Sequence, residues 1–187
     1  MRIAITGASG LIGSALTRRL ADEGHEPVPV VRRAPGDNEI GWSVAENRID
    51  TGAFDGIDAV VHLAGAGIGD RRWSDDYKRE ILESRTVGTA LVANAVTAAT
   101  NGPKVLLSGS AIGFYGASPD ATFDEQSPAG TGFLADVCDA WEAAAAPATG
   151  GGTRVAYLRT GIVLSAAGGA LKKQLPLFKA FLGGKMG

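Results

Sequence analysis

The feature that most constrains the fold of this sequence is a series of three glycines, spaced three residues apart, near its start. They follow the apolar stretch Ile3–Thr6 and lead into a segment, 11–23, whose apolar residues have helical spacing. Gly7 permits a tight turn, Gly10 lets the backbone approach a ligand without a Cβ in the way, and Gly13 lets a helix pack closely on a strand. The spacing therefore predicts a buried strand, a sharp turn and a helix whose free N–H groups face that turn.

The rest of the chain repeats this alternation of short apolar runs and longer helical segments, which is typical of βαβ units that feed one parallel sheet. The expected strands are 3–6, 27–31, 59–63, 105–108 and 155–158, with a weaker one at 40–44, and the expected helices are 11–23, 75–100 and 134–146. A further helix, 171–182, is interrupted at Pro176, and 149–152 is a loop. Because right-handed crossovers place helices on both faces, we predict an α/β fold of Rossmann type: a doubly wound parallel sheet in three layers, α/β/α.

Length and composition narrow the class of partner. At 187 residues, the chain is long enough for one α/β domain and too short for a full second one. A net charge of −2, from 18 basic and 20 acidic residues, argues against a nucleic-acid or membrane surface. The single cysteine, Cys138, cannot form an internal disulfide, which favours a reducing, cytoplasmic location. We therefore expect a small-molecule partner and predict no metal site.

The glycine turn predicts a site for a dinucleotide pyrophosphate, held by the N–H groups and dipole of the following helix. Where an NAD site places Asp or Glu against the ribose, the second strand ends in Arg32-Arg33. Two guanidiniums suit a 2′-phosphate and favour NADP(H) over NAD(H), the alternative being two solvated loop arginines. Asp37 and Glu39 follow too late for the ribose role. The predicted cofactor contacts are Thr6, Gly7, Ser9, Gly10, Leu11, Ile12, Gly13, Arg32, Arg33, Leu63, Ala64, Gly65 and Ser108.

Several longer motifs resemble one enzyme family. TGASGLIG at 6–13, DAVVHLAG at 58–65, SGSA at 108–111 and FYG at 114–116 resemble the extended short-chain dehydrogenases, the NAD-dependent epimerase/dehydratase group. RRW at 71–73, SR at 84–85, SAIGFYG at 110–116, WE at 141–142 and LRTGIVL at 158–164 resemble its sugar-epimerase-like subgroup, often called only "epimerase family protein". The resemblance implies a doubly wound sheet, NADP binding and a substrate site at the carboxyl ends of the strands.

The resemblance also indicates which catalytic groups are present. In the family a serine orients the substrate oxygen, a tyrosine acts as acid or base, and a lysine four residues later lowers the pKa of the tyrosine. Ser110 matches the serine, but Leu134 stands at the tyrosine position and Cys138 at the lysine position. A helical asparagine that completes the relay in many relatives falls near Arg85. The usual proton relay is therefore absent, and Cys138 is expected to be an inert buried thiol.

Other side chains offer substitutes for that relay. Tyr115 is predicted to present its phenol to the cleft as an acid. Arg71, Arg72 and Arg85 are predicted to hold an anionic substrate or to stabilise negative charge. The alternatives are that Tyr115 is a partly buried aromatic lid residue and that the arginines are solvated. His62 is expected to be a structural histidine rather than a catalytic one.

Two functions remain open from the sequence. One is an NADP-dependent oxidoreductase or epimerase for a carbonyl or sugar-type small molecule, with Ser110 and Tyr115 in catalysis; the other is a protein that binds or senses NADP(H) without turnover. Because members of the family continue beyond this length, the chain is expected to be truncated. We expect one Rossmann domain over 1–187, with 170–187 starting the substrate side and the C-terminal substrate lobe missing. A homodimer through 75–100 and 134–146 is expected by analogy.

Overall fold

The computed structural model describes residues 1–50, 52–118 and 120–184, and its strands form one seven-stranded sheet. The strands are β1 (Arg2–Thr6), β2 (Glu26–Val31), β3 (Ile40–Ser43), β4 (Arg48–Ile49), β5 (Ala59–His62), β6 (Val105–Ala111) and β7 (Arg154–Thr160). Their spatial order is β4-β3-β2-β1-β5-β6-β7, and every neighbouring pair is parallel except β3 and β4. The order reverses between β1 and β5, which is the switch point where open α/β sheets bind ligands.

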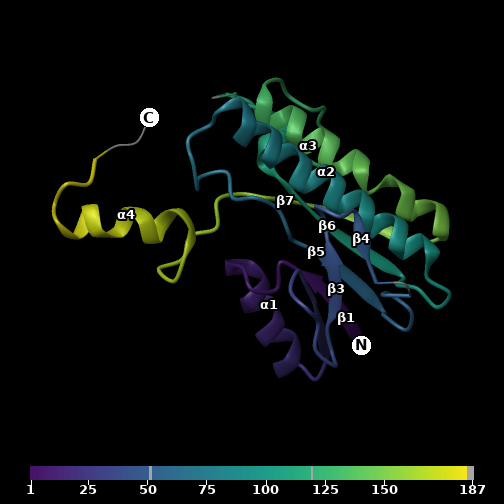
Figure 1. The fold of residues 1–187 in the computed structure, drawn as a ribbon. Coiled ribbons are helices and arrows are strands. Elements are labelled where there is room, and N and C mark those ends of the chain that lie inside the picture. The colour runs from purple at the N-terminus through teal and green to yellow at the C-terminus, as the bar shows by residue number, and fades with distance from the viewer. Residues whose placement is uncertain (51, 119, 185–187) are drawn as a thin grey trace.

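Helices cover both faces of this sheet. They are α1 (Leu11–Asp22), α2 (Asp75–Ala98), α3 (Phe133–Ala144) and α4 (Gly169–Lys179), with the 3-10 turns η1 (Ile112–Tyr115) and η2 (Ala146–Gly151). In Figure 1, α1 lies on one side of the strands, α2 and α3 run side by side on the other, and α4 stands apart from both. The predicted three-layer Rossmann-type fold is therefore confirmed.

The central strands are apolar on both faces because each face packs against a helix layer. Along β1, Ala4 belongs to the core cluster that includes Val92 of α2, whereas Ile3 and Ile5 pack with Leu16 of α1. Successive side chains of a strand point to opposite faces, so a strand between two helix layers is apolar throughout. This explains why the strands read as continuous apolar runs.

The sequence did not predict the short strand Arg48–Ile49, which pairs antiparallel with β3. Two expectations for local structure are wrong. Helix α4 continues through Pro176 instead of being interrupted there, although a proline in a helix interior lacks the N–H that would donate to the preceding turn. The expected loop at 149–152 is largely the 3-10 turn η2. No helix within the described ranges combines the length and apolar character that crossing a membrane requires.

Candidate functional site

The glycine turn joins β1 to α1 at the carboxyl edge of the sheet. Gly7 has a φ of +67°, in the left-handed region that favours glycine, and a Cβ there would lie 3.0 Å from the carbonyl carbon of Leu63. A Cβ on Gly13 would lie 2.8 Å from the Cα of Ala8, closer than real side chains approach. The N–H of Gly10 donates to the carbonyl of Gly7 at 2.9 Å. Helix, turn and strand are thus so close that only glycine fits at positions 7 and 13.

Thr6 ties this turn to the neighbouring strand β5. Its hydroxyl accepts from the backbone N–H groups of Leu63, at 3.0 Å, and Ala64, at 3.1 Å, and lies 2.7 Å from Nδ1 of His62. With its oxygen accepting two bonds, the hydroxyl donates its one hydrogen to Nδ1, which places the proton of the neutral ring on Nε2. Complete burial lowers the pKa of His62 to about 4. His62 is therefore a neutral structural histidine, as expected.

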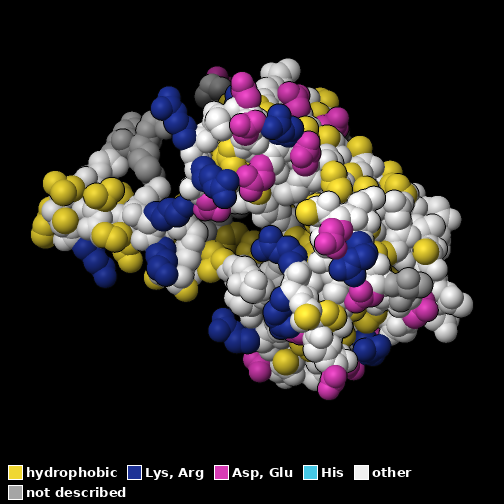
Figure 2. Space-filling model, viewed as in Figure 1, with side chains coloured by type: hydrophobic (Ala, Val, Ile, Leu, Met, Phe, Trp, Pro, Cys, Tyr) yellow, Lys and Arg dark blue, Asp and Glu magenta, His cyan; other side chains and the backbone are white. Residues whose placement is uncertain are grey.

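The predicted cofactor residues differ in accessibility. Ser9, Gly10 and Ile12 are exposed at the start of α1, and Leu63 to Gly65 follow β5 beside the turn. The side chains of Thr6 and Ser108 are fully buried, so they support the cleft from within rather than at its surface. Figure 2 shows a hollow where α1 meets the carboxyl ends of the strands, with hydrophobic side chains at its floor and Lys and Arg side chains around it.

The two arginines after β2 have different surroundings. Arg33 donates to Glu39 through Nη1 at 2.7 Å and Nη2 at 2.6 Å, and to the carbonyl of Ala34 at 2.9 Å. The bonds from Arg33 and from the N–H of Gly36 lower the pKa of the Glu39 carboxyl. Arg32 is exposed and makes no side-chain hydrogen bond or ion pair to the described residues. Only Arg32 therefore keeps its guanidinium open to an incoming phosphate without losing a bond.

Ser110 and Tyr115 meet in a network around an ion pair. Arg159 of β7 donates to Glu142 of α3 through Nε and through Nη2, each at 2.8 Å. The same guanidinium donates to the phenolic oxygen of Tyr115 at 2.9 Å and lies 3.6 Å from the ring centroid of Phe114. Ser110 donates its hydroxyl hydrogen to Glu142 at 2.6 Å. The bonds to Glu142 and to Tyr115 raise the pKa of Arg159, which remains a fixed positive charge.

This network determines which protons are available. The one hydrogen of the Ser110 hydroxyl is used on Glu142, so the buried Ser110 oxygen can accept a further hydrogen bond but not donate one. The Tyr115 oxygen accepts from Arg159, so its own hydrogen stays free to donate. Beside them, Tyr115, Glu125, Tyr157 and Arg159 line a cleft of about 350 Å³. Of the two predicted catalytic hydroxyls, Tyr115 is therefore the donor and Ser110 the acceptor.

Sequence reasoning did not assign roles to Glu142 and Arg159. Both stand in motifs that carried the family resemblance, WE at 141–142 and LRTGIVL at 158–164. Acidic and basic residues inside otherwise apolar elements are seldom buried unless they are paired, and that signal could have identified both.

The three predicted substrate arginines do not form one cluster. Arg71 is exposed and forms an ion pair with Glu80 at 3.2 Å, and Arg72 is exposed as well. Arg85 is half-buried on α2, where its guanidinium lies 4.9 Å from the ring centroid of Trp141. Of the three, only Arg85 is held within the fold.

At the position of the family's lysine the chain has a thiol instead of a cation. Cys138 is buried on α3, and burial raises the pKa of its thiol, which is therefore neutral at physiological pH. Leu134, at the tyrosine position, lies one turn earlier on the same helix. The structure therefore agrees with the expectation of an inert thiol.

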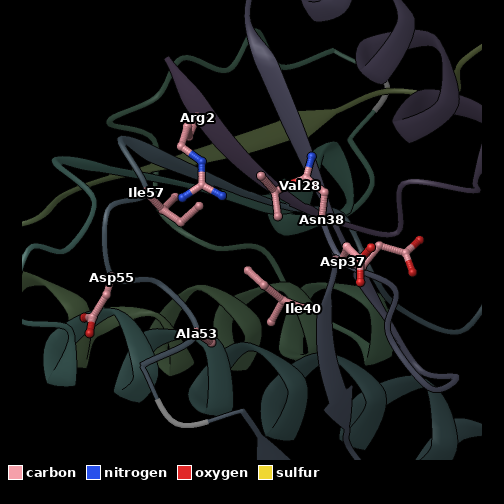
Figure 3. Close-up of a pocket in the computed structure, with 9 residues that line it drawn as sticks. Arg2, Val28, Asp37, Asn38, Ile40, Ala53, Asp55 and Ile57 are labelled. Carbon is pink, nitrogen blue, oxygen red and sulfur yellow. The ribbon is translucent and has the colours of Figure 1, made fainter.

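A second cavity lies far from these groups. Its volume is about 140 Å³, and Figure 3 shows Arg2, Val28, Asp37, Asn38, Ile40, Ala53, Asp55 and Ile57 around it. Arg2 begins β1, and Ile57 precedes β5, so this cavity is at the amino ends of parallel strands. Ligands of open α/β sheets bind outside the carboxyl ends, and this cavity is therefore no part of the candidate site.

Comparisons with known proteins agree with this geometry. A model of the NAD dependent epimerase/dehydratase family matches residues 3–166. An epimerase family protein of Mycobacterium bovis is 45% identical over 99% of this chain and 61% of its own length, and the human epimerase family protein SDR39U1 is 37% identical over 100% and 63%. The chain thus spans about three fifths of the length of these curated relatives.

Two solved structures with the same fold share more than a third of their aligned residues with this chain. A nucleoside-diphosphate sugar epimerase from Corynebacterium glutamicum superposes with a TM-score of 0.86 at 40% identity, covering 100% of this chain and 39% of that one. Human SDR39U1, crystallised with NADPH, superposes with a TM-score of 0.86 at 37% identity, covering 98% of this chain and 61% of that one.

Proposed function

The chain belongs to the NAD dependent epimerase/dehydratase family, and on this basis we propose that it binds NADP(H) at the carboxyl ends of β1, β2 and β5. The observation that carries the proposal is the glycine turn, where a Cβ at Gly13 would overlap the backbone of Ala8. Such close packing is needed where a dinucleotide pyrophosphate rests against a helix N-terminus. The NADPH complex of human SDR39U1, a relative of this chain, supports the choice of cofactor.

Each part of the cofactor has candidate partners in the described chain. The exposed turn from Ser9 to Ile12 offers backbone N–H groups and the positive end of α1 to the pyrophosphate. Arg32, which has no competing carboxylate partner within the described residues, would take the 2′-phosphate. The segment from Leu63 to Gly65 would border the nicotinamide side, next to Gly7.

The proposed activity is oxidation–reduction or epimerisation of a carbonyl or sugar-type small molecule. When bound, NADP(H) supplies hydride transfer to or from carbon. Tyr115 donates its free hydrogen to the substrate oxygen, and Ser110 accepts from a substrate hydroxyl. The ion pair of Arg159 and Glu142 holds both hydroxyls in place. The proposed location of this activity is the cytoplasm. The proposal treats residues 1–187 as one Rossmann domain. It also includes a homodimer that forms through α2 and α3.

A second candidate function is the binding or sensing of NADP(H) without turnover. It is favoured by two observations: the single hydrogen of the Ser110 hydroxyl is used on Glu142, and Leu134 and Cys138 occupy the family's tyrosine and lysine positions. Neither leucine nor a neutral buried thiol can carry a proton relay.

Hydride transfer distinguishes the two functions. The absorbance of reduced nicotinamide would be followed with a panel of sugars, aldehydes and ketones, in the unaltered chain and in Tyr115→Phe and Ser110→Ala. An enzyme oxidises NADPH with at least one substrate, and Tyr115→Phe slows that reaction by about 10²-fold or more because it removes the donated proton. Tight NADPH binding with no absorbance change across the panel supports the sensing function instead.

A further inference from the structure

Residues 161–173, the strap, connect β7 to the first turn of α4 and contact the start of α1. Within the strap, a bridge between Ser165 and Gly168 closes a tight turn. A Cβ on Gly168 would lie 3.2 Å from Cδ1 of Leu11, and one on Gly169 would lie 3.3 Å from Cδ2. Figure 1 shows the strap beside the start of α1, with the rest of α4 beyond it. The turn therefore packs on Leu11, the first residue of the helix proposed to hold the pyrophosphate.

The far end of the strap reaches the loop that leads into α2. Nζ of Lys173 donates to the carbonyl of Gly69 at 2.9 Å and lies 3.3 Å from a carboxylate oxygen of Asp70. Helices α1 and α2 cover opposite faces of the sheet (Figure 1). The strap thus joins the two helix layers across the carboxyl edge of the sheet, where the dinucleotide cleft is proposed.

The loop that leads into α2 is held in shape by contacts of its own. The indole N–H of Trp73 donates to the carbonyl of Ile68 at 2.7 Å, and the hydroxyl of Tyr77 donates to the carbonyl of Gly67. A Cβ on Gly67 would overlap the carboxylate of Asp70, so this carboxylate is folded back on its own loop. The loop is therefore a preformed acceptor for the lysine of the strap.

The strap, in contrast, is held weakly. Helix α4 has no buried residue, and Ile162, Val163 and Leu164 of the strap are exposed. The side chains of Lys173 and Asp70 are 63% and 64% exposed, and an ion pair in contact with water contributes little stability. Segments with few buried apolar contacts open locally at a low free-energy cost. The strap can therefore swing away while the sheet and its helix layers stay folded.

We propose that the strap is a gate over the cofactor cleft, and that the bonds of Lys173 to Gly69 and Asp70 are its latch. The inference rests on the proposed function, because it concerns how NADP(H) enters and leaves that site. The latch consists only of groups of the chain, so weakening it favours the open strap with and without bound cofactor. Entry and release then accelerate by the same factor, and the affinity stays unchanged.

Stopped-flow fluorescence of NADPH tests the gate. Mixing with excess protein measures entry, a chase with excess NADP⁺ measures release, and calorimetry measures affinity separately. In Lys173→Met and in Asp70→Asn both rates rise by about threefold, the size expected from an exposed ion pair, and Kd stays within about twofold. Lys172→Met is the matched control, since Lys172 is exposed on the same helix and makes no side-chain bond to the described residues.

Combined variants show whether the two residues act as one latch. The double variant Lys173→Met with Asp70→Asn exchanges NADPH no faster than Lys173→Met alone, because each change removes the same ion pair. Lys173→Asp alone places two carboxylates together and speeds exchange further. Combining it with Asp70→Lys restores an ion pair of opposite direction and slows exchange again, an outcome that a general loss of structure would not produce.

The contrary results are distinct. Unchanged rates in Lys173→Met and Asp70→Asn, or an equal rise in Lys172→Met, overturn the gate. A loss of NADPH affinity with unchanged entry also overturns it, because Lys173 would then contact the cofactor itself. Absence of NADPH binding in the unaltered chain contradicts the proposed function, whereas binding with rates that do not depend on the latch contradicts the gate alone.

Discussion

In the β1–α1 region the candidate site is made of backbone, whereas in the β6–α3–β7 region it is made of side chains. Gly7 and Gly13 bring a helix and a strand so close that no Cβ fits between them. Across the sheet, Glu142 and Arg159 come from different elements and meet as a two-pronged ion pair that holds Ser110 and Tyr115. The backbone arrangement suits a cofactor that many proteins bind in the same way, and the side-chain arrangement can vary with the substrate.

Removing Glu142 should have the largest effect and tests the side-chain region. Its side chain is 9% exposed and that of Arg159 17%, so Glu142→Ala leaves a buried charge unpaired, at an expected cost of about 3–5 kcal/mol of unfolding free energy. Urea unfolding measures this cost. Ser110→Ala, which removes one hydrogen bond, is the control at about 1 kcal/mol. Equal costs for the two variants would show that the ion pair does not organise this region.

Gly13→Ala tests the backbone region. The added Cβ would meet the Cα of Ala8 at 2.8 Å, so the turn must shift, at an expected cost of about 1–3 kcal/mol. We also expect NADPH affinity to fall by at least about tenfold, measured by calorimetry, because the shifted turn no longer presents its N–H groups to the pyrophosphate. Gly150→Ala is the control, since a Cβ there meets nothing within 4 Å. Unchanged NADPH affinity in Gly13→Ala would show that cofactor binding does not require the glycine spacing.

His62, which joins β1 to β5, predicts a dependence of stability on pH. Its pKa is about 4 in the folded chain, below the ordinary value of 6.5, so the unfolded chain takes up a proton first as the pH falls. Stability is therefore complete above about pH 6.5 and is lost towards pH 4, by about 2 kcal/mol between pH 7 and pH 5. Urea unfolding at several pH values measures the slope, and His62→Asn should remove most of it. A slope that persists in His62→Asn would assign it to other groups.

Arg32 and Arg33 give the smallest predicted effect and sharpen the assignment of the cofactor. Arg33 is held by Glu39, so Arg32→Ala should reduce the preference for NADPH over NADH by about tenfold, and Arg33→Ala by clearly less. Calorimetric titration of both cofactors measures the preference. In Glu39→Gln the released Arg33 should raise NADPH affinity slightly. If Arg33→Ala reduced the preference for NADPH over NADH more than Arg32→Ala did, the roles of the two arginines would be reversed.

The contrast between the two regions also explains what the sequence could predict. The glycine turn involves neighbours within seven residues, and strands buried on both faces are continuous apolar runs, so the Rossmann-type fold follows from local pattern. The short antiparallel strand Arg48–Ile49 was missed because two residues carry no periodicity.

The side-chain region could be predicted only in part. Ser110 was predicted from the family resemblance and Tyr115 from its place in the loop beyond it, but the direction of their hydrogen bonds depends on Glu142, 32 residues from Ser110, and on Arg159, 44 residues from Tyr115. The division of roles between Arg32 and Arg33 likewise depends on Glu39, a residue that the sequence offered only as a poor candidate for the ribose. Pairing across elements is a property of the folded chain, and spacing along one element does not reveal it.

The most direct test of the central claim is a calorimetric titration of the unaltered chain with NADPH and with NADH under identical conditions. We predict that NADPH binds at least about tenfold more tightly, because the 2′-phosphate gains a charged contact with Arg32. Equal affinities would contradict the assignment of NADP(H), and absence of binding by either cofactor would contradict the proposal that the glycine turn of this chain is a dinucleotide site.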